Sequence, residues 1–230
     1  NKAIEINLQF AEAWNNKGVT LGWLGKHREA LDAYIKATGI NPVFAPAYCN
    51  LGEILFNLGA LEPASTYVDR AINLNNRFTP ALLLRGKIEI EQGDYSKASD
   101  SFTQAISSAL GNPLPILWQA YAKYLKAESA ANKESGEYRD NIAGIIRQLE
   151  RADELFKPGN KELKAFILYY LGCFCYKNGD ILEAKRKLKQ CVSLKSKSPI
   201  ELSVRELLDS IWNHAIRPPW WRWWLDSPLN

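Results

Sequence analysis

The stretch AEAWNNKGVTLGWLGKHREALDAYIKATGINP, residues 11–42, recurs along the chain in a recognisable form. Small residues return at a fixed step of 34 residues, while the side chains between them vary. A fixed period of this length indicates a solenoid, in which short supersecondary units stack on one another. The residues that keep the period over 11–112 are Gly18, Gly52 and Gly86; Gly25, Gly59 and Gly93; Ala30, Ala64 and Ala98; and Ala37, Ala71 and Ala105.

Each of these residue types has a physical reason to recur. Gly18 and Ala30 have little or no side chain, so two helices can approach closely there. Gly25 allows the positive φ that closes one helix and turns the chain toward the next. Pro42 cannot continue a helix and therefore ends the second one. Each unit has an apolar face that only its neighbours can bury, so the stacked array offers an extended surface suited to binding.

This pattern resembles the tetratricopeptide repeat (TPR). The resemblance implies an all-α, right-handed TPR-like solenoid of antiparallel helix pairs, with a capping helix at its C-terminal end. It also implies a non-catalytic protein–protein interaction scaffold that binds a peptide or protein segment on its concave face. The residues that carry the resemblance in the first copy are Trp14, Gly18, Gly25, Ala30, Tyr34, Ala37 and Pro42.

The repeat pattern divides the chain into segments. We expect helices of about 12–15 residues in each repeat, a longer helix over 116–133 and another over 140–156. The chain contains no methionine and opens inside a repeat, so we expect it to be part of a longer sequence. The expected segments are 1–10, the end of an upstream repeat; 11–112, three repeats; 113–160, a degenerate and enlarged helix pair; 161–198, a further repeat; 199–216, the capping helix; and 217–230, a tryptophan-rich tail.

Charge and composition restrict the function classes. The net charge of +4 over 230 residues is too small to indicate nucleic acid, and we expect no nucleic-acid partner. Residues 1–112 carry 10 basic against 11 acidic side chains, whereas residues 113–230 carry 19 against 14. The four cysteines do not have the spacing of a zinc site or of a disulfide framework. Neither a signal peptide nor a bilayer-spanning apolar run is evident, so we expect a cytoplasmic protein, or one that is membrane-associated at full length.

The sequence offers little that could carry out catalysis. The two histidines, His27 and His214, have no nucleophile or metal-ligand partner in sequence, and His27 sits in a repeat turn where a packing role is expected. Phosphate-binding, dinucleotide-binding and zincin motifs are missing. We therefore expect no enzyme activity, no cofactor and no metal. A basic run, Lys185 to Lys189, is interpreted as a solvated face, with contact to an anionic partner as the alternative.

The resemblance implies that the first helix of each unit lines the concave face. Asn16 and Asn50 occupy equivalent positions and are similar to the asparagine ladder with which superhelical TPR domains hold a peptide backbone. The ladder stops at Leu84 and Tyr170. Several residues of this face could instead be inter-repeat core. The peptide-binding residues we expect are Asn16, Trp23, Asn50, Phe56, Lys87, Tyr169 and Tyr176.

The tail is the part of the chain that the repeats do not explain. Four tryptophans lie within five residues after Pro218-Pro219. Side chains of this size bury about 150–250 Å² each, so we expect them to be covered. They could pack on the capping helix, enter a groove of the same or a neighbouring molecule, or lie at a lipid interface; the last would make the chain a membrane-surface adaptor with a juxtamembrane tail. The residues are Trp220, Trp221, Trp223 and Trp224.

Overall fold

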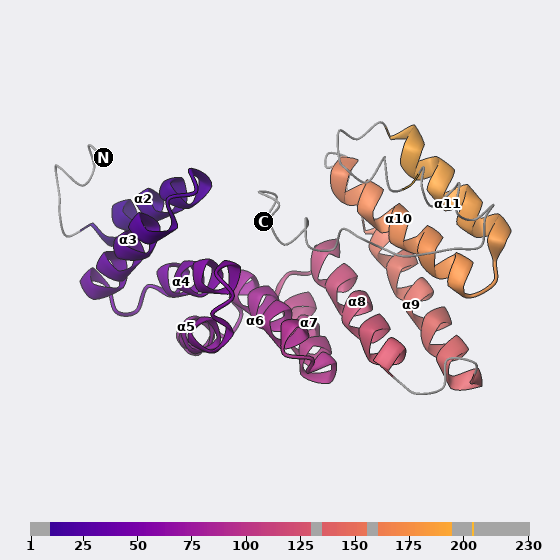
Figure 1. The fold of residues 1–230 in the computed structure, drawn as a ribbon, viewed down its shortest axis with the longest axis horizontal. Coiled ribbons are helices and arrows are strands. Elements are labelled where there is room, and N and C mark those ends of the chain that lie inside the picture. Colours follow the sequence, from indigo (N-terminus) through magenta and orange to yellow (C-terminus); the bar gives the residue numbers. More distant parts are fainter. Residues whose placement is uncertain (1–9, 130–134, 156–160, 195–203, 205–230) are drawn as a thin grey trace. The chain divides into compact units, whose positions relative to one another are not determined.

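A computed structural model describes residues 10–129, 135–155, 161–194 and 204 of the chain. The described residues form helices joined by turns, as the all-α prediction requires (Figure 1). They fall into two compact units, a first unit that ends at Ser108 and a second unit that begins at Ala109. Each unit is described by itself below.

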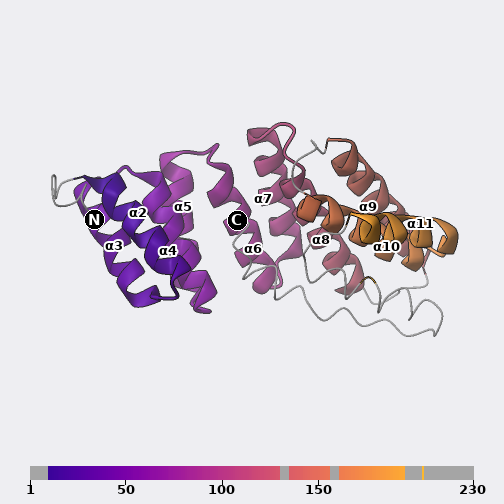
Figure 2. The ribbon, with the colours of Figure 1, turned by 90° about the horizontal axis from the view of Figure 1, so that it is seen from above.

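The first unit consists of three helix pairs that follow the repeats of the sequence. Each helix has 13 or 14 residues, so the prediction of about 12–15 residues is confirmed. Each pair packs against the next, and the first helices α2, α4 and α6 also contact one another in order. Figures 1 and 2 show the pairs from two sides. The helices are α2 (Ala11–Trp23), α3 (His27–Ile40), α4 (Ala45–Asn57), α5 (Leu61–Leu74), α6 (Thr79–Glu91) and α7 (Tyr95–Ser108).

The turn inside each repeat needs a glycine for its backbone conformation. Gly25 has a φ of 73°, in the left-handed region that residues with a Cβ rarely adopt. Its N–H donates to the Gly22 carbonyl at 3.0 Å, and the N–H of Lys26 donates to the Leu21 carbonyl at 2.9 Å. These bonds satisfy carbonyls that the end of α2 would otherwise leave unpaired. Gly59 and Gly93 have φ values of 78° and 80°, so the same turn recurs in all three repeats.

The glycine in the middle of each first helix lets the second helix approach. A Cβ on Gly18 would lie 2.5 Å from the ring of Tyr34. At Gly86 it would lie 2.5 Å from the ring of Phe102, and at Gly52 it would lie 2.6 Å from a methyl of Val68. The filling side chain stands at the same offset from the glycine each time. A small residue on the first helix therefore matches a large one on the second, and this match defines the repeat.

Asparagines complete the turns between repeats. The side chain of Asn41 accepts a hydrogen bond from the N–H of Val43 at 3.2 Å, and that of Asn75 accepts one from the N–H of Arg77 at 3.1 Å. Such Asx turns favour a change of chain direction. The second repeat lacks the closing proline of the first, and Asn75 keeps the same connection without it.

The second unit contains two longer helix pairs. The helices are α8 (Pro113–Ser129), α9 (Gly136–Glu154), α10 (Lys161–Lys177) and α11 (Ile181–Ser193). Helix α8 starts before the predicted Ile116 because the side chain of Asn112 accepts from the N–H of Leu114 at 3.0 Å. Helix α9 starts at Gly136 rather than at the predicted Asp140, because the Ser135 hydroxyl caps it by accepting from the N–H of Tyr138 at 3.1 Å.

The last helix pair repeats the packing of the first unit. A Cβ on Gly172 in α10 would lie 2.6 Å from Leu188 in α11, and Gly179 between the helices has a φ of 87°. Ala184 and Cys191 are buried, as their equivalence to Ala30 and Ala37 predicts. Helix α9 packs on both α8 and α10. The expected capping helix, 199–216, lies outside the described residues except for the buried Val204.

Candidate functional site

The first helices of the three repeats bring a pair of asparagine side chains together. The amide nitrogen of Asn50 in α4 donates to the amide oxygen of Asn15 in α2 at 2.8 Å. Asn15 is buried, whereas the neighbouring Asn16 is exposed. The predicted ladder residue Asn50 therefore contacts Asn15, the neighbour of the other predicted ladder residue, Asn16. Asn15 and Asn50 stand 35 positions apart, one more than the 34-residue period.

A half-buried carboxylate and a buried ammonium group lie on the first helices of the second and third repeats. Glu53 in α4 and Lys87 in α6 occupy equivalent positions of adjacent repeats, and only 8% of Lys87 is exposed. Burial raises the pKa of Glu53 and lowers the pKa of Lys87 to about 8, while the attraction between the two groups opposes both shifts. Burial also raises the pKa of the nearby Cys49 thiol, which keeps it protonated.

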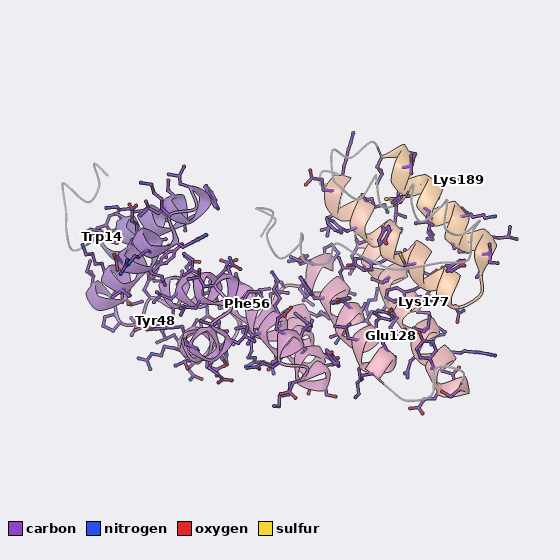
Figure 3. The ribbon with its side chains drawn as sticks, viewed as in Figure 1. Trp14, Tyr48, Phe56, Glu128, Lys177 and Lys189 are labelled. Atoms are coloured by element: carbon purple, nitrogen blue, oxygen red, sulfur yellow. The ribbon has the colours of Figure 1, made fainter. Side chains whose placement is uncertain are left out.

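The two apolar residues predicted on this face differ widely in their exposed fraction. Phe56 is 8% exposed and belongs to the core between the second and third repeats. Trp23, at the end of α2, is 76% exposed. Figure 3 shows Phe56 on α4, together with Trp14 and Tyr48, which occupy equivalent positions on α2 and α4. Lysine ammonium groups lie over the Trp14 ring, that of Lys36 at 4.4 Å from its centre.

The second unit places one of its predicted site residues, Tyr169, in an aromatic cluster. Tyr169 is buried, and Tyr176 is half-buried. The rings of Tyr169 and Tyr170 meet edge to face at 5.6 Å, and the cluster continues from Tyr170 to Tyr121 in α8 at 6.4 Å. The aromatic surface expected here is therefore largely packed inside the unit.

A polar network borders this cluster. Lys177 at the end of α10 donates to the Tyr124 hydroxyl at 2.6 Å and to the Glu128 carboxylate at 2.9 Å (Figure 3). Tyr138 at the start of α9 donates to the same carboxylate at 2.6 Å. One carboxylate thus joins the ends of three helices. No motif indicates this network, because Lys177 stands 49 residues from Glu128 and the contact follows no repeat.

The predicted site residues thus separate into different environments. Asn16 and Trp23 are exposed, Asn50 and Tyr176 are half-buried, and Phe56, Lys87 and Tyr169 are buried. Sequence reasoning placed Asn15 and Glu53 on the same face but did not single them out; their repeat positions were the available signal. The tail residues Trp220, Trp221, Trp223 and Trp224 and also His214 lie outside the described residues.

Neither a metal-binding cluster nor a membrane-spanning helix is found among the described residues. Within the described residues, no group of three or more histidine, cysteine, aspartate or glutamate side chains is arranged to hold a metal ion. Of the helices in that part of the chain, none is both long and apolar enough to span a bilayer.

The fold and the repeated glycine contacts define an α-helical repeat solenoid. The sequence model of the tetratricopeptide repeat matches residues 11–44, and related models of the same description match 45–78 and 79–112. Residues 11–112 of this chain therefore belong to the tetratricopeptide repeat family, and the predicted resemblance is confirmed. Among proteins with curated descriptions, none matches the chain in sequence.

Solved structures share the fold at low sequence identity. YrrB, described as a TPR protein with an unusual peptide-binding site, is 16% identical, with a TM-score of 0.57 over 89% of this chain and 96% of its own. PilW, a type IV pilus biogenesis factor, is 16% identical, with a TM-score of 0.68 over 88% of this chain and 86% of its own. Yeast Tom70 is 16% identical, with a TM-score of 0.72 over 93% of this chain and 42% of its own. These matches confirm an all-α TPR-like solenoid, and together with the family they support a protein–protein interaction scaffold.

Proposed function

We propose that the first unit binds an extended peptide or protein segment on the face formed by α2, α4 and α6. The observation that supports this most directly is the contact between the amides of Asn15 and Asn50. That contact uses one donor of Asn50 and one acceptor site of Asn15. Each amide has further donors and acceptors, and this combination suits the alternating N–H and C=O groups of an extended main chain.

The opposite charges of Glu53 and Lys87 on this face favour a ligand whose contacts are uncharged. Glu53 and Lys87 attract each other and together carry no net charge. A ligand side chain with a single charge would gain little from such a pair and would lose its hydration. We therefore expect main-chain contacts and apolar contacts, such as those that the exposed Trp23 can make, to dominate binding.

The test uses peptides of ten residues selected on the wild-type chain from a random-sequence display library. Their dissociation constants are then measured by fluorescence polarisation for three chains. Replacing both asparagines, Asn15→Ala with Asn50→Ala, should weaken binding about tenfold or more, because buried amide contacts are worth on the order of 1–3 kcal/mol. Asn73→Ala makes the same chemical change at an exposed position of α5 and is the matched control.

Two outcomes would contradict this proposal. One is the failure of any peptide to be selected on a chain whose circular dichroism shows it to be folded. The other is equal affinity of the selected peptides for the double variant and for Asn73→Ala, which would move the site away from the asparagine pair.

A membrane-surface adaptor is the second candidate function, and α11 supports it. The start of this helix exposes Ile181 and Leu182, at 47% and 83%, and further along it exposes Arg186 and Lys189. Apolar residues next to cations are typical of helices that lie at an anionic lipid surface. Glu183 weakens the case, because it binds Arg186 at 2.5 Å and lies 3.8 Å from Lys187.

Flotation with phosphatidylserine vesicles tests this second candidate. Wild-type protein should float at low salt, and Lys185→Gln with Lys189→Gln should reduce the floated fraction several-fold. Lys26→Gln with Lys97→Gln removes two exposed charges of the first unit and is the control. Equal flotation of both double variants, or none for the wild type, would contradict a lipid-binding role of α11.

A further inference from the structure

The turns of the first unit carry two rows of exposed side chains. Trp23, Asn57 and Glu91 occupy one repeat position at the ends of α2, α4 and α6, and all three are exposed. The next position in each repeat holds Leu24, Leu58 and Gln92, which are also exposed. We call these six residues the Trp23 edge. Because α2 contacts α4 and α4 contacts α6, the two rows run across neighbouring turns.

The Trp23 edge is apolar at one end and acidic at the other. Trp23, Leu24 and Leu58, at the ends of two neighbouring first helices, are 76%, 67% and 54% exposed, and large apolar side chains gathered in this way are typical of an interaction surface. At the other end Glu91 is exposed, and Gln92 donates to the exposed carboxylate of Glu62 at 3.4 Å. A ligand matched to this edge is therefore aromatic or apolar and carries a positive charge.

One segment of this chain has that chemistry. Residues 217–225 read Arg-Pro-Pro-Trp-Trp-Arg-Trp-Trp-Leu, with two positive charges and no negative one. The first unit carries one more acidic than basic side chain over 10–108, whereas residues 109–194 carry four more basic than acidic ones. Electrostatic attraction therefore directs the segment to the first unit and away from the second.

The length of the segment also fits. Nine extended residues span about 30 Å, and the two steps between the three first helices span about 16–20 Å, since packed helices lie 8–10 Å apart. A pair of prolines favours the polyproline conformation, which docks on exposed aromatic side chains without a large loss of entropy.

We propose that residues 217–225 bind the Trp23 edge of the first unit, with their tryptophans on Trp23, Leu24 and Leu58 and their arginines toward Glu91 and Glu62. The proposal rests on the proposed function, because the edge borders the face assigned to peptide binding. It names a segment of this same protein as the ligand of the edge beside that face.

The test uses the full chain with its own segment disabled, Trp220→Ser with Trp221→Ser, Trp223→Ser and Trp224→Ser. A fluorescein-labelled synthetic peptide of residues 217–230 is titrated onto this chain. The peptide should bind to this variant chain. It should bind at least several-fold more weakly to the wild-type chain, because the wild-type chain's own segment competes for the edge. Adding Trp23→Ala should weaken binding about tenfold, the usual effect of losing an aromatic anchor. Ile35→Ala removes an exposed apolar side chain from α3 and should have no effect.

A second measurement keeps the proposal testable if the fourfold variant does not fold. Hydrogen exchange of the wild-type chain should be slower at the ends of α2 and α4 than in the chain with Arg222→Glu. Sedimentation across a concentration series shows whether the segment binds within one molecule or between two.

Several outcomes would overturn the proposal. They are the absence of peptide binding to the folded fourfold variant, an affinity unchanged by Trp23→Ala, and capture of the peptide by phosphatidylserine vesicles in preference to the protein. If display-selected peptides still bind in an Asn50-dependent manner while the 217–230 peptide does not, this inference falls and the proposed function stands. If neither binds, both fall.

Discussion

The two units reach the same helix-pair architecture by different means. In the first unit, each repeat joins its helices through a glycine opposite a large side chain, as between Gly86 and Phe102. Among the described residues of the second unit, α10 and α11 alone are joined in this way, between Gly172 and Leu188. Helices α8 and α9 instead share polar contacts, in which Gln148 donates to Gln119 and accepts from Lys123.

This difference shows what the sequence period measures. The period records the small-to-large contact inside a helix pair, because that contact needs a glycine at one fixed place. A pair that is held by longer side chains needs no fixed glycine and leaves no period. The loss of the repeat after Asn112 therefore marks a change in how the two helices of a pair are joined, and helix pairs continue beyond it. Variants can test this contrast.

The largest effect is expected where the small-to-large contact loses its large partner. Phe102 is fully buried against Gly86, so Phe102→Ala should lower the free energy of unfolding by about 3–5 kcal/mol. Urea denaturation followed by circular dichroism measures it. Thr103→Ala, at an exposed position of the same helix, is the control. A cost under 1 kcal/mol would mean that the glycine contact does not hold the repeat together.

A smaller effect is expected when the small partner is enlarged. Gly18→Leu should cost about 1–3 kcal/mol, because its first added carbon already overlaps the ring of Tyr34. Gly22 lies on the same helix with open space around it, so Gly22→Ala should be neutral or stabilising by up to about 1 kcal/mol. Equal behaviour of the two variants in the same urea experiment would remove the reason given for the period.

The second unit should depend on its polar network instead. Lys177→Met removes both hydrogen bonds to Tyr124 and Glu128 and leaves a half-buried carboxylate with one fewer partner. A cost of about 1–2 kcal/mol is expected. Lys126→Met, an exposed lysine in the last turn of α8, is the comparison. Indistinguishable unfolding curves for the two variants would show that the network is not needed to join the helices.

The first unit should show a stability change confined to alkaline pH. Lys87 titrates near pH 8 when folded but near 10.5 when unfolded, so the unfolded chain holds the extra proton between these values. The contribution of Lys87 to the free energy of unfolding should therefore rise with pH over this window, whereas the Cys49 thiol, whose pKa burial raises, contributes in the opposite direction at the upper end. Lys87→Met should abolish that rise. Glu53→Gln removes the attraction that raises the pKa of Lys87, so in this variant the rise should begin at a lower pH. Urea midpoints from pH 7 to 10.5 measure this slope, and a wild-type slope equal to that of Lys87→Met would contradict it.

The sequence predicted the first unit well because each of its elements has a local cause. Gly25 and Gly93 indicate the turns, and Pro42 indicates the end of α3. In the second unit, α9 begins four residues before the predicted residue 140, because the Ser135 side chain caps the helix there.

The candidate site was harder to predict than the fold. Repeat equivalence singled out Asn16 and Asn50, but it gave no sign that the Asn50 amide contacts Asn15, which lies one position outside that equivalence. Equivalence likewise placed Phe56 and Tyr169 on a binding face without showing that neighbouring helices bury them. A period gives the position of a residue within its own repeat, whereas burial depends on the helix that follows, which has its own sequence.

The buried thiols make the motions of each unit measurable. Cys49 is enclosed in the first unit, whereas Cys175 and Cys191 are enclosed in the second. Burial raises the pKa of Cys49 and raises that of Cys175 to about 11, so at neutral pH few of these two thiols are ionised. Reaction of any of the buried thiols with a disulfide reagent must wait until the surrounding helices part. In a chain whose other cysteines are replaced by alanine, the labelling rate of Cys49 would report how often α4 opens. In the corresponding chain that keeps Cys191, the labelling rate would report how often α11 opens. The native cysteines thus allow the opening rate of each unit to be measured without introducing a new cysteine.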